Sequence, residues 1–182
     1  MRITLLQYGY TSVAKGTNRK SIEHLRREAR MYERLRPLQG SDVPVFLGRL
    51  HLRQPYDYDY GMQVVYMLFL SWGGECVLSS KAALGMDQAA LDGQLLPLLR
   101  RVHGLGVVHM DVRGPNVLWC EETRRVMLVD FERSISCAAA GERDRDPVRE
   151  RVVQFGKRED LYVAGLIIEP PSREVYPYRR FY

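Results

Sequence analysis

The segment from His109 to Asn116 constrains the fold of this chain more than any other feature of the sequence. It reads His-Met-Asp-Val-Arg-Gly-Pro-Asn, and after a gap of hairpin length it is followed by Val129-Asp130-Phe131. Short apolar runs of strand length surround these polar residues, at 107–108, 117–119 and 126–129. The pattern predicts two acids and an amide on turns at the ends of strands.

The residue types suit transfer of a phosphoryl group, which needs charge neutralisation and placement more than covalent help from the protein. Asn116 and Asp130 offer a neutral and an anionic oxygen, a ligand pair suited to Mg²⁺ that also holds nucleotide phosphates. Asp111 is the candidate base that orients a hydroxyl and accepts its proton. The alternative is a polar turn in which Asx side chains satisfy the backbone and Gly114-Pro115 reverse the chain.

The spacing His-x-Asp-x-x-x-x-Asn, followed by a hairpin and Asp-Phe, resembles the protein-kinase-like superfamily, and most of all the abbreviated kinase-like proteins common in fungal genomes. Val13-Ala14-Lys15 is similar to the family's strand lysine, which holds nucleotide phosphates. By this resemblance Glu28, on the following helix, forms an ion pair with Lys15. The resemblance extends from Thr11 to Ser134.

The resemblance implies an α+β, bilobal fold with a reduced N-lobe over residues 1–70 and a truncated, mainly helical C-lobe over residues 71–182. It also implies ATP and Mg²⁺ as cofactors, with Arg113 on the transferred phosphate and His109 as a structural brace rather than a base. The hinge that binds adenine through its backbone would include Leu70, Ser71, Trp72 and Gly73. Trp72 and Trp119 are expected to pack rather than to stack on a ligand.

The chain also departs from the family pattern. Only Gly9 precedes Lys15, so the glycine-rich loop is expected to be absent or to lie upstream. Met110 replaces a regulatory arginine, Glu132 replaces the glycine after Asp-Phe, and the 50 residues after position 132 contain no Ala-Pro-Glu. Three interpretations therefore remain: an ATP-dependent phosphotransferase acting on an unknown protein or small-molecule hydroxyl, a catalytically inactive binding module, and a fragment of a longer kinase.

Periodicity and turn residues predict the remaining elements. A hairpin is expected over residues 3–15 around Gly9, a helix over 18–36 ended by Pro37, and strands over 43–52 and 62–70 that flank a turn over 54–61. A linker over 71–74 separates these from a helix over 87–103 that Pro97 kinks or restarts. A last helix over 147–168 is expected to break near Gly156, and residues 170–182 to form a loose or surface-bound tail.

Composition excludes several classes of protein. With 182 residues, 46% of them hydrophobic and 27% charged, the chain has enough apolar material for one folded core. The net charge of +5 comes from arginines interleaved with acids, which favours solvated helix faces over a nucleic-acid surface.

The longest apolar run, 161–168, is too short to cross a membrane, and no secretion signal is visible, so we expect an intracellular protein of the cytoplasm or nucleus. Three widely spaced cysteines predict neither a disulfide nor a metal site.

Overall fold

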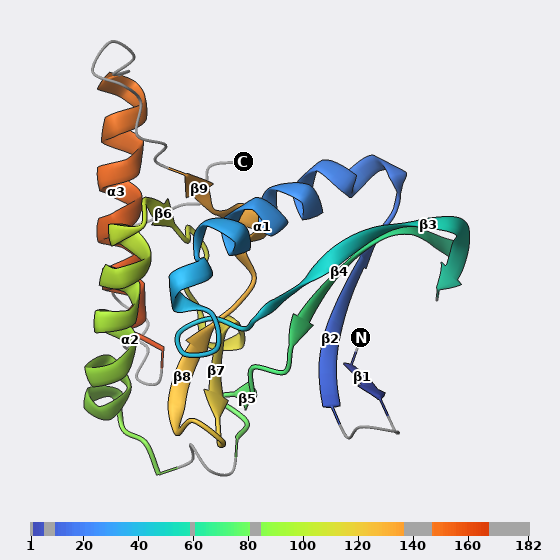
Figure 1. The fold of residues 1–182 in the computed structure, drawn as a ribbon. Helices are drawn as coiled ribbons and strands as arrows, with labels where there is room; N and C mark the ends of the chain where they lie inside the picture. Colours follow the sequence, from blue (N-terminus) through green and yellow to red (C-terminus); the bar gives the residue numbers. More distant parts are fainter. Residues whose placement is uncertain (1, 6–9, 59–60, 81–84, 137–146, 168–182) are drawn as a thin grey trace.

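The computed structural model describes residues 2–5, 10–58, 61–80, 85–136 and 147–167 of the chain (Figure 1). The first part contains β1 (Arg2–Leu5), β2 (Tyr10–Thr17), α1 (Ile22–Arg34), β3 (Phe46–Tyr58) and β4 (Met62–Ser71). The second part contains β5 (Glu75–Cys76), α2 (Gln88–Gly104), β6 (Val107–Val108), β7 (Val117–Cys120), β8 (Arg125–Leu128), β9 (Ile135–Ser136) and α3 (Pro147–Ala164). Within the described residues no helix is both long enough and apolar enough to cross a membrane.

The first four strands form an antiparallel sheet in the order β1-β2-β4-β3. The predicted hairpin is confirmed, with Leu5 opposite Tyr10, and its turn around Gly9 lies outside the described residues. Lys15 on β2 pairs with Leu68 on β4, whose side chain is fully buried. The pleat therefore points Lys15 toward the sheet face that α1 covers (Figure 1).

The predicted first helix is confirmed as α1, and its burial pattern explains its orientation. Asn18 caps the preceding 3₁₀ turn by accepting hydrogen bonds from the amides of Lys20 and Ser21 at 3.0 and 3.2 Å. Leu25, Glu28 and Tyr32, three and four residues apart, all lie on the buried side of the helix. Glu28 is thus a carboxylate on an otherwise apolar stripe, directed at the sheet.

The expected turn over residues 54–61 was wrong for most of its length, because β3 continues to Tyr58. The pairing of β3 with β4 shifts between His51 and Tyr56 and then resumes with Tyr56 opposite Val64. The interval contains Pro55, which cannot donate a ladder hydrogen bond and is tolerated where the pairing is irregular. Tertiary pairing therefore extends the strand beyond the point where turn residues predict its end.

Helix α2 runs through Pro97 without a break, so the expected restart was wrong. Leu91, Leu95 and Leu98 are buried by 98% or more. Their burial contributes about 1.5 to 3 kcal/mol each, which outweighs the cost of about 3 kcal/mol for an internal proline. The Asp87 side chain caps the helix by accepting from the Ala90 amide at 2.8 Å.

The second part of the chain is built on two small sheets, β5-β7-β8 and β6-β9. The β7–β8 hairpin has the predicted form, with Val117 opposite Leu128 and Cys120 opposite Arg125. Helices α2 and α3 lie side by side against these strands (Figure 1). A single hydrophobic core runs through both parts, so the elements around His109–Asn116 rest on the same apolar packing as α1.

Candidate active site

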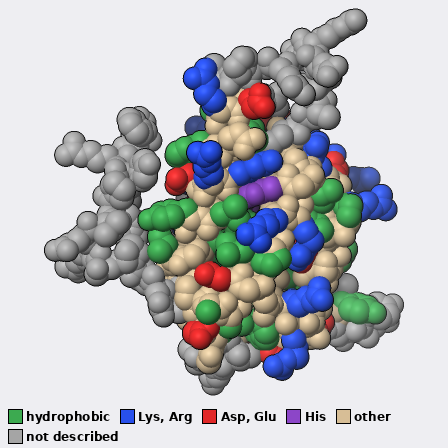
Figure 2. Space-filling model, turned by 90° about the vertical axis from the view of Figure 1, so that its left-hand side faces the viewer, with side chains coloured by type: hydrophobic (Ala, Val, Ile, Leu, Met, Phe, Trp, Pro, Cys, Tyr) green, Lys and Arg blue, Asp and Glu red, His purple; other side chains and the backbone are tan. Residues whose placement is uncertain are grey.

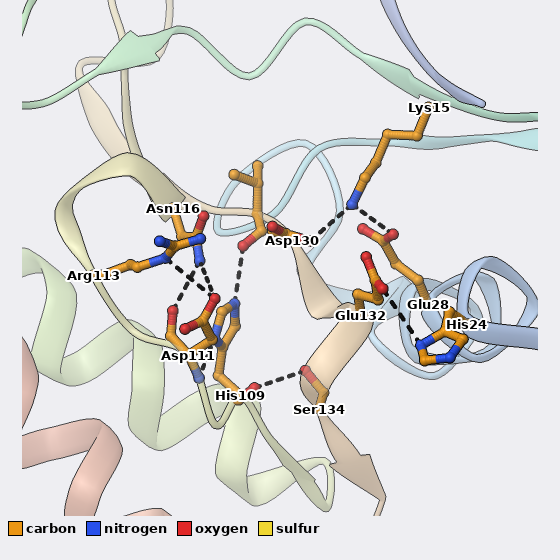
Figure 3. A network of polar contacts seen from close by, with 11 residues as sticks. Lys15, His24, Glu28, His109, Asp111, Arg113, Asn116, Asp130, Glu132 and Ser134 are labelled. Atoms are coloured by element: carbon orange, nitrogen blue, oxygen red, sulfur yellow. Dashed lines mark hydrogen bonds and ion pairs between the residues drawn. The ribbon is translucent and has the colours of Figure 1, made fainter. Parts of the chain in front are cut away.

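Lys15 joins the two parts of the chain through a network of polar contacts (Figure 3). Its Nζ lies 2.7 Å from Glu28 Oε2 and 2.7 Å from Asp130 Oδ1. The three residues come from β2, α1 and the turn after β8. The predicted ion pair of Lys15 with Glu28 is therefore present, and Asp130 shares the same ammonium group.

Burial and charge act against each other in this triad. Burial disfavours the charge on Lys15, but the two carboxylates outweigh it and raise the pKa of Lys15 above its ordinary value. Burial raises the pKa of Glu28, and Lys15 offsets only part of that effect; Glu28 Oε1 is buried and has no hydrogen-bond partner in the described part of the chain. Burial also opposes the charge on Asp130, but the hydrogen bond from Lys15 and its charge lower the pKa of Asp130. Lys15 and Asp130 are thus charged at neutral pH.

Asp111, Arg113 and Asn116 form a second polar group, on the loop before β7. Asn116 Nδ2 donates to the Asp111 backbone oxygen at 2.8 Å and to Asp111 Oδ2 at 3.1 Å. Arg113 Nε lies 3.2 Å from Asp111 Oδ2. The 3₁₀ turn Gly114–Asn116 brings the amide back over Asp111, which explains why a spacing of five residues places the two side chains together.

His109 connects the two polar groups. Its Nδ1 accepts from the Asp111 amide at 3.2 Å, so the ring proton lies on Nε2, which donates to the Val129 carbonyl at 2.9 Å. Burial lowers the pKa of His109, although the Val129 carbonyl and nearby carboxylates act in the opposite direction. A neutral, fully buried ring with both nitrogens engaged is a brace between the loop and the Asp130 turn, as the resemblance implies.

The backbone of Asp130 has a left-handed conformation, with φ of 69° and ψ of 64°. The next residue, Phe131, is fully buried and packs edge-on against the rings of His109 and Tyr32, with centroids 4.8 and 5.2 Å apart. Aromatic packing thus anchors the turn from both sides, and it holds the Asp130 carboxylate toward Lys15.

The predicted hinge residues lie at and just after the end of β4, and few of their backbone amides are free to bind an adenine base. The amide of Ser71 donates to Val45 at 2.9 Å and that of Trp72 donates to Thr11 at 3.2 Å, so neither is free for a base. Leu70 is buried within the sheet. Gly73 follows these residues, and Pro44 and Leu118 lie close to where a side chain at this position would start. Because the Ser71 and Trp72 amides are engaged, the backbone of Gly73 is the remaining candidate of the four to contact a base.

Sequence reasoning missed Asp160, on α3. This carboxylate is 2% exposed and accepts from the amides of His109 and Met110 at 2.8 and 2.9 Å and from His103 Nε2 at 3.0 Å. It therefore fixes the backbone just before Asp111. The signal was present in the sequence, because Val153, Gly156, Asp160 and Ala164 form one buried helical stripe that contains an acid.

Two further contacts around the site were also missed. Arg133 NH1 lies 3.8 Å from Asp111 Oδ1, so a second guanidinium stands beside the oxygen that Arg113 leaves open. His24 Nδ1 on α1 lies 3.4 Å from Glu132 Oε1. Glu132 thus places a carboxylate of the Asp130 turn beside α1.

The oxygen atoms available as metal ligands at this site suit a cation that also binds phosphates, rather than a cation held by the protein alone. Among the described residues no group of three or more His, Cys, Asp or Glu side chains could hold a metal ion. Asn116 uses its Nδ2 for Asp111, which leaves its Oδ1 as an acceptor, and Asp130 adds one carboxylate. Mg²⁺ is commonly bound by one or two such oxygens together with substrate phosphates and water.

Comparison with known proteins defines the class of fold. The chain has a kinase-like fold: it superposes on a crystal structure of a Stt7 homologue from Micromonas algae, soaked with ATP, with a TM-score of 0.57 and 18% identity over 73% of this chain and 45% of the other. It is also 38% identical over 133 residues to the meiotic driver SPOK2 of Podospora anserina, a match that covers 73% of this chain and 16% of the driver. The chain thus spans a small part of that relative. No family model matches the chain.

Proposed function

We propose that this chain is an ATP-dependent phosphotransferase of the protein-kinase-like type. Residues 1–70 would form a small N-lobe and residues 71–182 a C-lobe, with the nucleotide held where Lys15 meets Asp130. The observation that carries the proposal is the ammonium of Lys15 at 2.7 Å from both Glu28 and Asp130, although Asp130 lies 115 residues along the chain from Lys15. A partly buried lysine and an acid brought together from such distant positions suit a site for an anion and its cation.

Each site residue then has a defined task. Lys15 binds the nucleotide phosphates, and Glu28 positions its ammonium group. Asn116 and Asp130 hold Mg²⁺, which when bound neutralises charge on the phosphates. The Gly73 backbone is the candidate contact for adenine.

The reaction would transfer the terminal phosphoryl group of ATP to a hydroxyl. Asp111 orients the hydroxyl and accepts its proton, while Arg113 stabilises the charge of the transferred group. A bond forms between the acceptor oxygen and the terminal phosphorus, the bond from that phosphorus to the bridging oxygen breaks, and ADP leaves. The acceptor, a protein or a small molecule, is not specified by these residues.

A thermal-shift titration with ATP tests nucleotide binding directly. A ligand that binds only the folded chain raises the melting temperature. At a concentration of 100 times Kd it adds about 2.7 kcal/mol to the free energy of unfolding. We expect a shift at millimolar ATP that Mg²⁺ increases, and a smaller one in Lys15→Met. Arg53→Glu, at an exposed position on β3, is the control and should keep the full shift. No shift in the wild type would refute the proposal.

Turnover separates the enzyme from its main competitor, a catalytically inactive nucleotide-binding module. A specific observation favours that competitor: both carboxylate oxygens of Asp111 stand beside guanidinium groups, at 3.2 and 3.8 Å, which compete with an acceptor hydroxyl for the same oxygens. If the chain is an enzyme, it should release phosphate or phosphorylate itself, and Asp111→Asn should lower that rate at least 100-fold while keeping the ATP shift. An ATP shift without turnover in the wild type would favour the binding module.

A further inference from the structure

A second polar site lies away from the residues described so far, in a groove of about 630 Å³. Its walls come from the connection between α1 and β3, from helix α2, and from the turn between β7 and β8. None of the residues proposed to handle nucleotide lines it. The volume lies within the range of roughly 300 to 1,000 Å³ found for ligand sites.

The charge in this groove is mostly positive. Arg101, Arg124 and Arg125 line it, and Asp42 is the one acid among the residues that do. Both oxygens of Asp42 are already engaged by Arg101, whose Nε and NH2 lie 2.6 and 2.7 Å away. The acid therefore fixes Arg101 in place and offers little repulsion to an incoming anion.

The other two arginines stand on the β7–β8 turn and are exposed. Arg124 has a positive φ of 52° and contacts Glu121 only loosely, at 3.5 Å, with both side chains more than 60% exposed. An exposed pair of this kind contributes about 0 to 1 kcal/mol and exchanges readily for another partner. Arg125 is the first residue of β8 and lines the same groove. The turn and the start of this strand therefore place two guanidinium groups beside the fixed Arg101.

Apolar residues complete the groove and indicate what kind of anion fits. Pro37, Leu38, Pro97 and Val126 line it together with the arginines. Gln94 uses its Oε1 to accept from the Val126 amide at 3.2 Å, which leaves its amide nitrogen as a donor. Figure 2 views the molecule from the side of α2 and α3, and basic side chains are more prominent than acidic ones over its lower right part.

We propose that this groove binds a short peptide segment of a partner protein in which acidic and apolar residues alternate. The carboxylates would pair with Arg101, Arg124 and Arg125, and the apolar side chains would rest on the prolines and Leu38. Charge complementarity favours this occupant, and the apolar lining favours a peptide over a free phosphate. A nucleic acid would need a long basic track to follow its backbone, whereas the arginines here are confined to one groove.

Fluorescence anisotropy with a labelled peptide tests the proposal on the whole chain. The probe is an eight-residue peptide of alternating Glu and Leu, and the competitors are inorganic phosphate and a single-stranded oligonucleotide of equal charge. We expect the peptide to bind, with an affinity that falls as salt rises. Arg125→Glu should weaken it about tenfold, since attraction becomes repulsion at one contact.

Matched variants separate the groove from net charge. Arg53→Glu makes the same charge change at an exposed site on β3 outside the groove, and it should alter the affinity less than twofold. Arg124→Asn, which suits a positive φ, is a second groove variant in case Arg125→Glu does not fold. Both groove variants should show the same ATP-induced shift in melting temperature as the wild type.

The proposal would be overturned by no binding of the peptide, by equal losses in Arg125→Glu and Arg53→Glu, or by tighter binding of the oligonucleotide with the same dependence on Arg125. Displacement of the peptide by phosphate at equal concentration would also overturn it, because the groove would then be a general anion site.

Discussion

Asp160 accepts hydrogen bonds from three donors on one buried carboxylate, and it holds the backbone of the two residues that precede Asp111. Asp160→Asn replaces one acceptor oxygen by a donor, which would face either the Met110 amide or the His109 amide together with the His103 ring. We expect a loss of about 1 to 3 kcal/mol in the free energy of unfolding, the cost of leaving a buried donor unsatisfied. Urea unfolding measures this loss.

The neighbouring Glu159 provides the control for that prediction. It lies on the same helix and is partly exposed, so Glu159→Gln should change the stability by less than about 0.5 kcal/mol. Equal losses in the two variants would mean that Asp160 contributes only its charge to the helix.

His109 makes the stability depend on pH. Its pKa is lowered by burial below the ordinary value of 6.5, so the unfolded chain takes up a proton that the folded chain refuses. The contribution of His109 to the free energy of unfolding should therefore be fully present above pH 6.5. It should fall as the pH decreases, with a slope of at most about 1.4 kcal/mol per pH unit, and level off below the pKa of the folded state. Urea unfolding between pH 5 and 8 measures the slope.

A variant isolates this effect, because the raised pKa of Glu28 acts in the opposite direction at acid pH. His109→Gln should remove most of the slope between pH 7 and the folded pKa. His51→Gln, at an exposed position on β3, should keep it. A slope that persists in His109→Gln would assign the pH dependence to other groups.

At this scale the site could be predicted where motif spacing determines geometry, since a turn of fixed length places Asn116 over Asp111. Glu28 was expected beside Lys15 only from the family resemblance, because helix periodicity alone groups the glutamates of this helix with its solvated charges. Asp160 and Arg133 could not be placed in this way, because their contacts depend on how α3 and the Asp130 turn pack. The partners of the Ser71 and Trp72 amides likewise become visible only when the neighbouring strands are in place.

Among the elements, α3 illustrates how packing overrides a local signal. The helix continues through Gly156, where a break was expected. A side chain at Gly156 would meet Met110 Sδ and, at 2.9 Å, Val108 Cγ1. The glycine is therefore required for the close approach of α3 to β6 and does not mark a helix end.

This explanation predicts opposite effects for the same substitution on two helices. Gly156→Ala should lower the free energy of unfolding by about 1 to 3 kcal/mol through overpacking. Gly93→Ala, on α2, has nothing within 4 Å of the new methyl group and should raise it by up to about 1 kcal/mol. Thermal and urea unfolding measure both. A gain in stability for Gly156→Ala would show that Met110 and Val108 move aside at little cost.

At the scale of the whole molecule, Asp42 ties the first part of the chain to the second. Its side chain is 5% exposed and binds Arg101 of α2, and its carbonyl accepts from the Leu128 amide on β8 at 2.8 Å. The connection after α1 is thereby attached to the strand that leads to Asp130. One acid thus links three elements that surround the proposed active site.

Removing the arginine should loosen this link. Arg101→Met keeps the length of the side chain but leaves the Asp42 carboxylate buried and unpaired. Loss of one partner of a fully buried pair costs about 3 to 5 kcal/mol, and because Arg101 is half exposed we expect about 1 to 3 kcal/mol. Urea unfolding measures the change, with exposed Arg100→Met as the control. Equal stability of the two variants would mean that water replaces the guanidinium.

The support that Asp160 gives to the loop has a consequence for the order of events during synthesis. The carboxylate that holds the His109 amide is added 51 residues after it. A nascent chain can therefore complete its first sheet and pack α1 on it while the loop with Asp111 still lacks its anchor. The native position of that loop should therefore be reached late on the ribosome, only once α3 has emerged and docked.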